Sequence, residues 1–404
     1  MERLVAPPLS LYVHFPWCVR KCPYCDFNSY TLAGPLAQEA YLARLEQDLA
    51  AQAPAVAGRT VQTVFFGGGT PSLFSPEAIG AVLGSARRHL ALAADAEVTL
   101  EANPGTIERG AFAEYRAAGV TRVSLGAQSF DETTLKALGR IHSPAETRIA
   151  AQELHAAGIG NFNLDLMYAL PGQDLAAALR DIEEALALSP AHLSHYQLTM
   201  EPGTLFAARP PPLPDEDLAA AMLAGCAERL ARAGFVQYEV SAYARPGRQC
   251  LHNLNYWSFG DYLGVGAGAH GKLSDARRGV IVRTTQLREP RRYLAAADEA
   301  LARRAVPADE LPFEFMLNAL RLTAGFRRGL FCERTGLPWS TLAAAMQRAT
   351  ERGLVLEQGE AVLPTPLGLR FLNETLLLFL SEKADLAGES ALSIAAEARP
   401  GGRA

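Results

Sequence analysis

Several features are scarce in this 404-residue sequence, and each absence narrows the possible roles. Its 38 Lys and Arg residues are outnumbered by 43 Asp and Glu residues, so the net charge of −5 lacks the basic excess of nucleic-acid-binding proteins. Residues 1–8 contain no apolar signal core, and no run approaches the roughly 18 apolar residues of a membrane span. We therefore expect a cytoplasmic protein that does not bind nucleic acid. A loose membrane association through a partner stays open.

Cysteine is also scarce, but three of the six residues stand together as C-x3-C-x2-C: Cys18, Cys22 and Cys25. Three thiolates on one loop can hold three irons of a cubane cluster and leave the fourth iron open, whereas a purely electron-carrying cluster normally takes four thiolates. A structural zinc site is the alternative, but it needs four closed ligands. A disulfide fits worse, because close-set odd cysteines without secretory features indicate metal or redox chemistry. The loop therefore predicts an iron–sulfur cluster with one iron reserved for a small molecule.

The first 240 residues alternate strand-like and helix-like segments, which is typical of βαβ units in a parallel sheet. We expect strands at 9–15, 61–66, 97–101, 120–125, 162–167 and 192–199. We expect helices at 36–53, 76–92, 107–118, 131–138, 144–157, 174–188 and 215–233. Periodicity alone allows either an open barrel or a doubly wound sheet.

Unusual residues occur at or just after the carboxyl ends of these strands. They include the cysteine loop, the Gly-rich segment 67–71, Glu101, Gln128 and Asp165. Barrel enzymes build their sites at that face, so the pattern favours an open α/β barrel with one composite site.

The alternation stops after residue 240. Residues 243–275 are rich in Gly, aromatic residues and His, and we expect a loop-like region that packs against the barrel mouth. Residues 309–381 look helical, except for strand-like segments at 354–356 and 361–363 around a Gln358-Gly359 turn, which suggest a small winged-helix-like domain. The Gly-, Ser- and Ala-rich residues from 384 onward predict a disordered tail. The predicted divisions are 1–240, 241–305, 306–383 and 384–404.

Glycines 67–69 and two acids are the candidate ligand contacts of the barrel. Three glycines allow a ligand to approach backbone amides closely, although a tight turn would explain them too. Glu101 and Asp165 each interrupt an apolar strand, and a buried carboxylate needs a hydrogen-bond donor. Ribose hydroxyls or a ligand ammonium would serve, and a salt bridge to a neighbouring Arg is the alternative. Gln128 and Arg140 are uninformative by themselves.

The segment around His252 combines an imidazole, aromatic residues and glycines. It contains the pattern HNxxYW, with Tyr256 and Trp257, and continues to His270. Such a surface could accept a flat apolar macrocycle with His as an axial iron ligand. A structural plug with a hydrogen-bonded His252 explains the same composition, and composition alone favours the plug.

Together these motifs resemble the radical S-adenosylmethionine (SAM) family of oxygen-independent coproporphyrinogen III oxidase-like proteins, in particular its heme chaperone branch. The resemblance covers about residues 9–381 and is most specific at 12–29 and 252–271. It implies a partial (β/α)6 barrel, an accessory region with the HNxxYW segment, and a small helical C-terminal domain. It also implies a [4Fe-4S] cluster on Cys18, Cys22 and Cys25, with SAM on the open iron. The SAM-lining residues implied by the resemblance are Tyr12, Tyr24, Gly68, Gly69, Thr70, Glu101, Gln128, Arg140 and Asp165.

One departure separates the two branches of this family. The oxidase carries a fourth cysteine two residues after the third, where this sequence has Phe27, and Tyr12 is preceded by only eleven residues, too few for the oxidase's N-terminal arm. The resemblance therefore implies a protein that binds heme and delivers it to heme-requiring proteins such as respiratory enzymes, with His252 as candidate ligand ahead of His270. Oxidation of coproporphyrinogen III is the alternative, and another radical SAM reaction is a third possibility.

Overall fold

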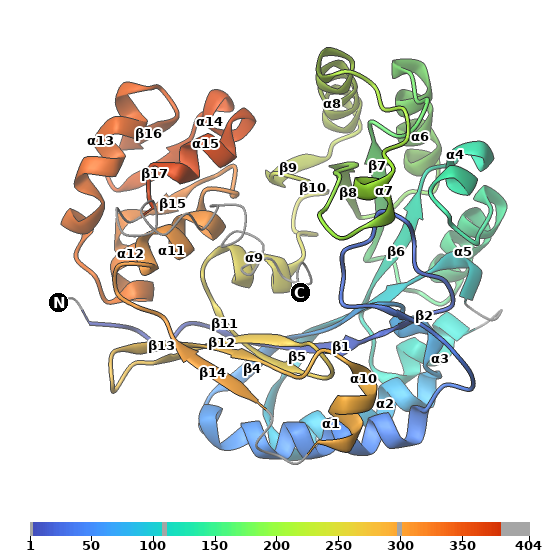
Figure 1. Ribbon diagram of the computed structural model, residues 1–404, viewed down its shortest axis with the longest axis horizontal. Coiled ribbons are helices and arrows are strands. Elements are labelled where there is room, and N and C mark those ends of the chain that lie inside the picture. The colour runs from blue at the N-terminus through green and yellow to red at the C-terminus, as the bar shows by residue number, and fades with distance from the viewer. Residues whose placement is uncertain (1–2, 107–110, 297–300, 381–404) are drawn as a thin grey trace.

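A computed structural model describes residues 3–106, 111–296 and 301–380 of the chain (Figure 1). Within these residues one twelve-stranded sheet dominates, in the order β14-β13-β12-β11-β1-β4-β5-β6-β7-β8-β10-β9. Its middle six strands are parallel and follow one another in chain order, which is the topology that the alternating pattern predicts. They are β1 (Leu9–Phe15), β4 (Thr60–Gly68), β5 (Ala91–Ala102), β6 (Arg122–Gln128), β7 (Phe162–Tyr168) and β8 (His192–Gln197).

Helices join these strands and cover the outer face of the curved sheet (Figure 1). Many begin at a side chain that caps the free backbone N–H groups of the first turn; Ser143 and Glu146, for example, form a complete capping box. The helices that connect or follow the six strands are α1 (Gln38–Gln52), α2 (Pro76–His89), α3 (Ala111–Ala118), α4 (Glu132–Ala137), α5 (Pro144–Ala156), α6 (Leu175–Ala187), α7 (Leu205–Ala208) and α8 (Glu216–Arg232).

The two faces of the six-stranded wall differ in chemistry. On β1, Leu9, Leu11 and Val13 point outward into the main hydrophobic core, with the helices. The inner face carries polar and aromatic side chains instead: the register aligns Tyr12 with Phe65, Phe65 with Thr99, and Thr99 with Arg122. Parallel sheets covered by helices on both faces are apolar on both, so the polar side chains of the inner face identify an open barrel rather than a doubly wound sheet. In the described residues β1 and β8 do not pair, and the barrel stays open.

The prediction of a loop over residues 243–275 is wrong. The structure has β10 (Ala242–Ala244), α9 (Leu251–Trp257), β11 (Asp261–Val265) and β12 (His270–Asp275) there. β11 pairs in parallel with β1, so it extends the barrel wall by one strand. Gly264 is one of the paired residues of β11. A Cβ at Gly264 would collide with the backbone of His270, and one at Gly271 with the Thr284 side chain. These glycines permit close strand contact, and their frequency was misleading evidence for a loop.

The remaining strands complete both edges of the sheet. Beyond β12 lie two antiparallel strands, β13 (Val280–Thr285) and β14 (Ala302–Ala305), with the short helix α10 (Pro290–Ala295) between them in sequence. At the opposite edge β10 and β9 (Val236–Glu239) pair antiparallel. A two-stranded parallel pair, β2 (Trp17–Cys18) with β3 (Tyr30–Thr31), closes the cysteine loop.

The C-terminal part (Figure 1, upper left) builds most of a second hydrophobic core, which Leu4, Phe259 and Ile281 join from the rest of the chain. The predicted wing is confirmed: β16 (Val355–Gln358) and β17 (Ala361–Pro364) form a hairpin, to which β15 (Phe326–Arg327) adds a third strand. Two short helices follow the hairpin, within the part of the chain that looked helical. The helices here are α11 (Leu311–Ala319), α12 (Arg328–Thr335), α13 (Ala343–Glu351), α14 (Pro366–Arg370) and α15 (Leu372–Leu377). The predicted disordered tail, 384–404, lies outside the described residues.

Polar contacts attach this second core to the barrel. Arg283 on β13 donates to Glu314 on α11 at 2.7 Å, and Arg321 donates to Glu239 on β9 at 3.0 Å. The Arg321 guanidinium also lies 4.4 Å from the ring centroid of Trp257 on α9. The C-terminal helices therefore contact both the outer edge of the sheet and the helix that carries His252.

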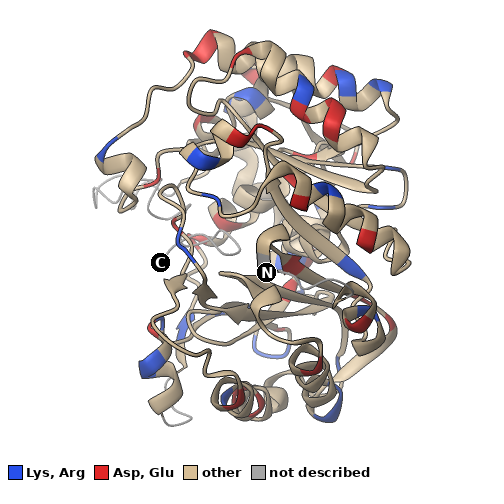
Figure 2. Ribbon diagram, turned by 90° about the vertical axis from the view of Figure 1, so that its right-hand side faces the viewer, with Lys and Arg blue, Asp and Glu red and all other residues tan. Residues whose placement is uncertain are grey.

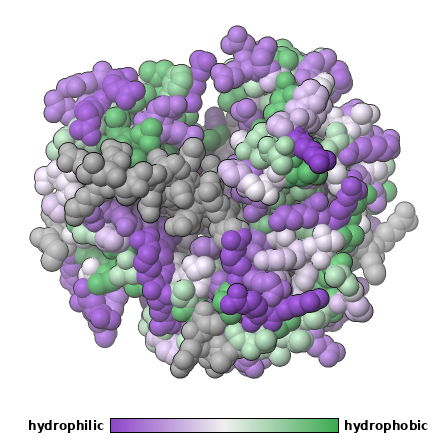
Figure 3. All heavy atoms as spheres, in the orientation of Figure 1, coloured by the Kyte–Doolittle hydropathy of each residue, from purple (hydrophilic) through white to green (hydrophobic). Residues whose placement is uncertain are grey.

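The described residues mix charged and apolar side chains on the faces shown in Figures 2 and 3. Lys and Arg alternate with Asp and Glu over the helices in Figure 2. Hydrophilic residues cover much of the described surface in Figure 3, with apolar residues in small groups between them. No helix among the described residues is long and apolar enough to cross a membrane.

Candidate cluster, SAM and heme site

The three clustered cysteines lie on the loop that follows β1, at the carboxyl end of the barrel. The loop is closed by the β2–β3 pair, and Cys25 N–H donates to the Cys22 carbonyl at 3.1 Å in a tight turn. All three side chains are half-buried, and all six cysteines of the chain are free thiols. Cys226 and Cys250 are fully buried elsewhere, so the loop is where thiols are grouped and accessible.

Each of the three sulfurs has a polar neighbour. Ser29 Oγ lies 3.8 Å from Cys25 Sγ, and Arg140 Nη1 lies 3.7 Å from Cys22 Sγ. The side chains of Thr70 and Ser29 lie near the Cys18 thiol and partly offset the rise of its pKa by burial. Burial raises the pKa of Cys18 and raises that of Cys25 to about 11, so both thiols are protonated near neutral pH. A bound metal would have to displace these protons.

The arrangement suits a cluster better than a single ion. Among the described residues, no three His, Cys, Asp or Glu side chains converge closely enough to hold one metal ion. A cubane spreads its thiolate ligands over separate irons, so it does not require three sulfurs to converge on one ion.

The Gly-rich segment is bonded directly to the cysteine loop. Gly69 N–H donates to the Phe15 carbonyl at 2.7 Å, and Thr70 N–H donates to the Trp17 carbonyl at 2.8 Å. A Cβ at Gly68 would collide with His14, and Gly68 has a φ of +118°, a conformation that side chains rarely adopt. The glycines thus bring the end of β4 against the cysteine loop.

The two strand acids lie at the same level of the barrel. Glu101 accepts from Gly68 N–H at 3.0 Å, and Asp165 accepts from Ser124 at 3.1 Å and from Asn163 at 2.7 Å. Burial and then the nearby Asp165 raise the pKa of Glu101 to about 8, and burial raises that of Asp165. Neither acid forms an ion pair with an Arg in the described part of the chain, so the salt-bridge alternative is not observed. Both carboxyls face the inside of the barrel.

Gln128 and Arg140 also lie at the carboxyl end of the barrel, near the cysteine loop. Arg140 Nη2 donates to the Gly126 carbonyl at 2.8 Å, which aims its guanidinium at Cys22. Gln128, at a φ of +65°, accepts from the hydroxyl of Tyr196 at 2.8 Å. Tyr196 was not among the predicted residues, although it continues the inward-facing alternation of β8.

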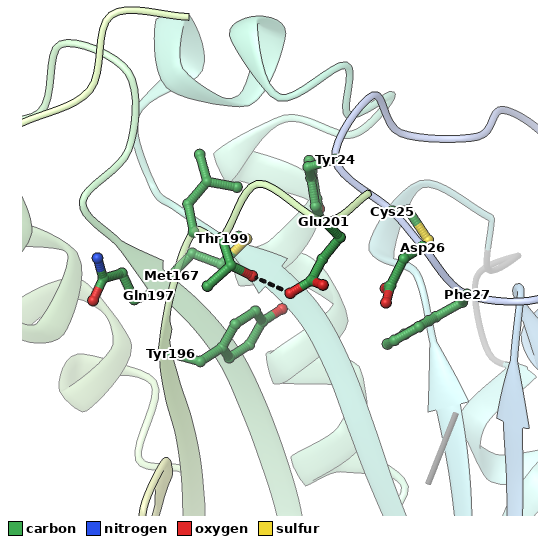
Figure 4. A pocket seen from close by; sticks show the side chains of 10 residues that line it. Tyr24, Cys25, Asp26, Phe27, Met167, Tyr196, Gln197, Thr199 and Glu201 are labelled. Carbon is green, nitrogen blue, oxygen red and sulfur yellow. Dashed lines mark hydrogen bonds between the residues drawn. The ribbon is translucent and has the colours of Figure 1, made fainter. Parts of the chain in front are cut away.

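A pocket opens beside the cysteine loop. In Figure 4 Tyr24 and Phe27 project from the loop, while Tyr196 and Glu201 come from β8 and the segment after it. Phe27 is 41% exposed, and its side chain lines this pocket at the position where the oxidase has a fourth cysteine. Met167 of β7 also lines the pocket, on the side of Tyr196.

His252 lies on the inner face of the barrel and not at its mouth. Its Nδ1 is 2.9 Å from Thr63 Oγ1, and the Thr63 hydroxyl in turn donates to Ser10 at 2.8 Å. Thr63 precedes Gly68 by five residues on β4, or ~16 Å of strand at ~3.3 Å per residue. Of the predicted SAM-lining residues, Tyr12 reaches it, with ring centroids 6.5 Å apart.

The hydrogen bonds around His252 define its tautomer. Because Thr63 donates its hydroxyl proton to Ser10, it accepts the Nδ1 proton of His252, and Nε2 keeps a lone pair. Burial lowers the pKa of His252 to about 3, so the ring is neutral. Glu97 fixes the start of α9 by accepting from the N–H groups of Leu251 and His252. His270 differs: its Nε2 is buried without a partner, and its Nδ1 lies 3.4 Å from Thr285.

Comparisons with known proteins identify the class. The chain matches the radical SAM superfamily over residues 12–185 and the HemN C-terminal domain over residues 306–371. The solved structure of coproporphyrinogen III oxidase (HemN) from Escherichia coli, described as a radical SAM enzyme, shares the fold with a TM-score of 0.79. It is 24% identical, over 93% of this chain and 91% of that one. The fold is therefore that of a radical SAM protein with a HemN-type C-terminal domain.

Curated relatives narrow the class to one family. The heme chaperone HemW of E. coli K12 is 49% identical over 93% of this chain and 99% of its own length. HemW of Mycobacterium tuberculosis is 38% identical over 89% of this chain and 92% of that protein. The bovine mitochondrial radical S-adenosyl methionine domain-containing protein 1 is 37% identical over 92% and 87%. The chain belongs to the HemW family.

Proposed function

We propose that this protein is a heme chaperone, which binds heme and transfers it to heme-requiring proteins, among them respiratory enzymes that are membrane-associated. The observation that carries this proposal is the 49% identity to a HemW heme chaperone across 93% of the chain, barrel and C-terminal region together. We place its activity in the cytoplasm. Functionally we divide the chain into a barrel (1–240), an accessory region (241–305) and a C-terminal domain (306–383).

In this proposal Cys18, Cys22 and Cys25 hold a [4Fe-4S] cluster. The support is their grouping on one closed loop, their partial exposure and the donors that face their sulfurs. Such a cluster would supply an open iron to the amino and carboxylate groups of SAM. The chain's contribution is to hold three thiolates and to keep Arg140 beside Cys22 as a compensating positive charge.

SAM would lie between the cysteine loop and the inner face of the barrel. Supporting contacts link the candidate residues to the loop: Thr70 lies near Cys18, Gly68 bonds Glu101, and Arg140 bonds Cys22. Glu101 and Asp165 offer carboxyl oxygens to ribose hydroxyls or to the amino group, in place of the ion pairs that they lack. The proposed SAM-lining set is Tyr12, Tyr24, Gly68, Gly69, Thr70, Glu101, Gln128, Arg140 and Asp165.

His252 is the proposed heme ligand. Iron needs a neutral imidazole with a free nitrogen whose other nitrogen is held by a hydrogen bond. The Ser10–Thr63–His252 chain supplies that arrangement through Nδ1 and leaves Nε2 available. The rings of Phe65 and Tyr12, 5.0 and 6.5 Å from the imidazole, provide an apolar surface beside it.

Coproporphyrinogen III oxidation is the alternative function, and the shared fold with HemN favours it. Phe27 argues against it, because a phenyl ring lines the pocket where the oxidase has a cysteine. The protein is then a radical SAM family member without that oxidase activity.

A paired experiment tests the proposal. Anaerobically reconstituted protein is titrated with heme, and the loaded protein is mixed with an apo-acceptor such as an apo-cytochrome of a respiratory enzyme. We expect a stoichiometric Soret change and its transfer to the acceptor. In parallel, the protein is incubated with coproporphyrinogen III, SAM and a reductant. Protoporphyrinogen formation without heme binding would decide for the oxidase.

A further inference from the structure

Ser29 is a buried residue in direct contact with the cysteine loop, and the resemblance assigns it no role. Its side chain and backbone are only 5% exposed. Its hydroxyl lies 3.8 Å from Cys25 Sγ, within hydrogen-bonding distance of a sulfur. One small side chain thus contacts a thiol of the cysteine loop directly.

The backbone of Ser29 is fixed from several sides. Lys21, between the first two cysteines, donates from Nζ to the carbonyls of Phe27 and Ser29 at 3.0 and 3.1 Å. Neighbouring Asn28 donates from Nδ2 to the carbonyls of Ala267 and Arg288, and its own carbonyl lies 2.9 Å from His14 Nε2. The hydroxyl is therefore held against the sulfur of Cys25, since the peptide on which it sits is bound to the sheet.

Chemistry determines the direction of the hydrogen bond when the sulfurs carry iron. A thiolate can only accept, so the Ser29 hydroxyl has to donate. Hydrogen bonds to the cysteine sulfurs are one of the terms that set the reduction potential of an iron–sulfur cluster. A donor stabilises the added electron of the reduced state, and the effect is stronger at a buried site.

Resting on the proposed cluster at Cys18, Cys22 and Cys25, we propose that Ser29 is a positioning residue that raises the reduction potential of this cluster by donating a hydrogen bond to the sulfur of Cys25. Thr70 and Arg140 also lie near sulfurs, but they belong to the proposed SAM-lining set. Ser29 is outside that set and lies next to β3 in sequence, and the test below is made without SAM.

The test is a redox titration of the reconstituted, SAM-free protein, followed by the EPR signal of the reduced cluster. We expect Ser29→Ala to keep full iron and sulfide content while its midpoint potential shifts to a more negative value. Ser85→Ala, which removes a buried hydroxyl on α2 far from the loop in sequence, should leave the potential unchanged. An unchanged potential in Ser29→Ala at full iron content would overturn the role of Ser29.

A second pair of variants keeps the test decisive if Ser29→Ala cannot hold the cluster. Thr and Val have nearly the same shape and differ in the hydroxyl, so Ser29→Thr should have a higher potential than Ser29→Val. Equal potentials in that pair would contradict the inference. Failure of the cluster proposal looks different, because unmodified protein would then take up no cluster at all.

Discussion

The cysteine loop and helix α9 both present ligand groups to the inside of the barrel, but they do so with very different numbers of residues. Around the cysteine loop, side chains from the ends of several strands converge, including Gly68, Glu101 and Arg140. At α9 one imidazole, His252, is held through Thr63 and Ser10. The loop end is thus built for a ligand with many polar groups, whereas α9 offers a single directional bond beside aromatic rings.

The difference also concerns where each feature gets its stability. The loop is half-buried and depends on backbone contacts with the Gly-rich segment. α9 is fixed at its start by Glu97 and at its end by the C-terminal region, through Arg321 over Trp257. A ligand of the cysteine loop can approach through the adjacent pocket. A ligand of His252 would instead bind to a helix that contacts both the barrel and the C-terminal region.

The largest effect is expected from the loop. Replacing Cys18, Cys22 or Cys25 by Ala removes one of three iron ligands, so the brown [4Fe-4S] chromophore should be lost after anaerobic reconstitution. Cys226→Ala, Cys250→Ala and Cys332→Ala should retain it, as measured by iron content and absorbance. Loss of the cluster in one of these three, with the fold intact by circular dichroism, would refute the ligand assignment.

The next largest effect is expected from α9. His252→Ala removes the iron–nitrogen bond, so heme affinity should fall by roughly 100-fold or more and the Soret band should shift, since even the loss of a supporting hydrogen bond typically costs 10–100-fold. Cluster content and SAM binding should stay normal. If both His252→Ala and His270→Ala leave affinity and spectrum unchanged, the heme site lies elsewhere and the segment is structural.

A smaller change tests the hydrogen-bond chain itself. Thr63→Val keeps the shape of the side chain but removes the acceptor for His252 Nδ1–H, and heme affinity should fall by about tenfold. The matched control is Thr60→Val, an exposed position on the same strand. Equal heme titrations for the two variants would show that Thr63 does not orient the ligand.

The smallest effect concerns Glu101 at the loop end. Its folded pKa, about 8, is raised above the usual value, so its contribution to stability is fully present at pH below about 4.5 and is lost as the pH rises through about 8. Between pH 5 and 6 the ligand-free wild type should therefore lose about 1 kcal/mol of unfolding free energy relative to Glu101→Gln. Denaturant titrations at both pH values measure this. The exposed control Glu114→Gln should show the same change of unfolding free energy with pH as the wild type. If Glu101→Gln also changes with pH as the wild type does, the prediction is wrong.

The sequence predicted the barrel and its loop end well for a definite reason. Parallel strands place their carboxyl ends at one edge, so Glu101 and Asp165, far apart in the chain, could be assigned to one side without knowing any contact. The segment 243–275 was mispredicted because Gly264 and Gly271 serve close strand packing, and glycine content alone does not separate that use from a loop. Ser29, Thr63 and Tyr196 gave no motif signal, since a hydroxyl becomes informative only when its partner is known.

By itself the sequence determined the cysteine spacing, the order of the parallel strands and the replacement of the oxidase cysteine by Phe27, because each depends on residues that are neighbours in the chain or on a period of the backbone. The tertiary structure decided that β11 joins the barrel wall beside β1, that Ser29 contacts the sulfur of Cys25, and that His252 meets Thr63 on the inner face. The His252–Thr63 bond joins residues 189 positions apart, and its 2.9 Å length depends on how α9 packs against β4. Such contacts follow from packing, which no local pattern encodes.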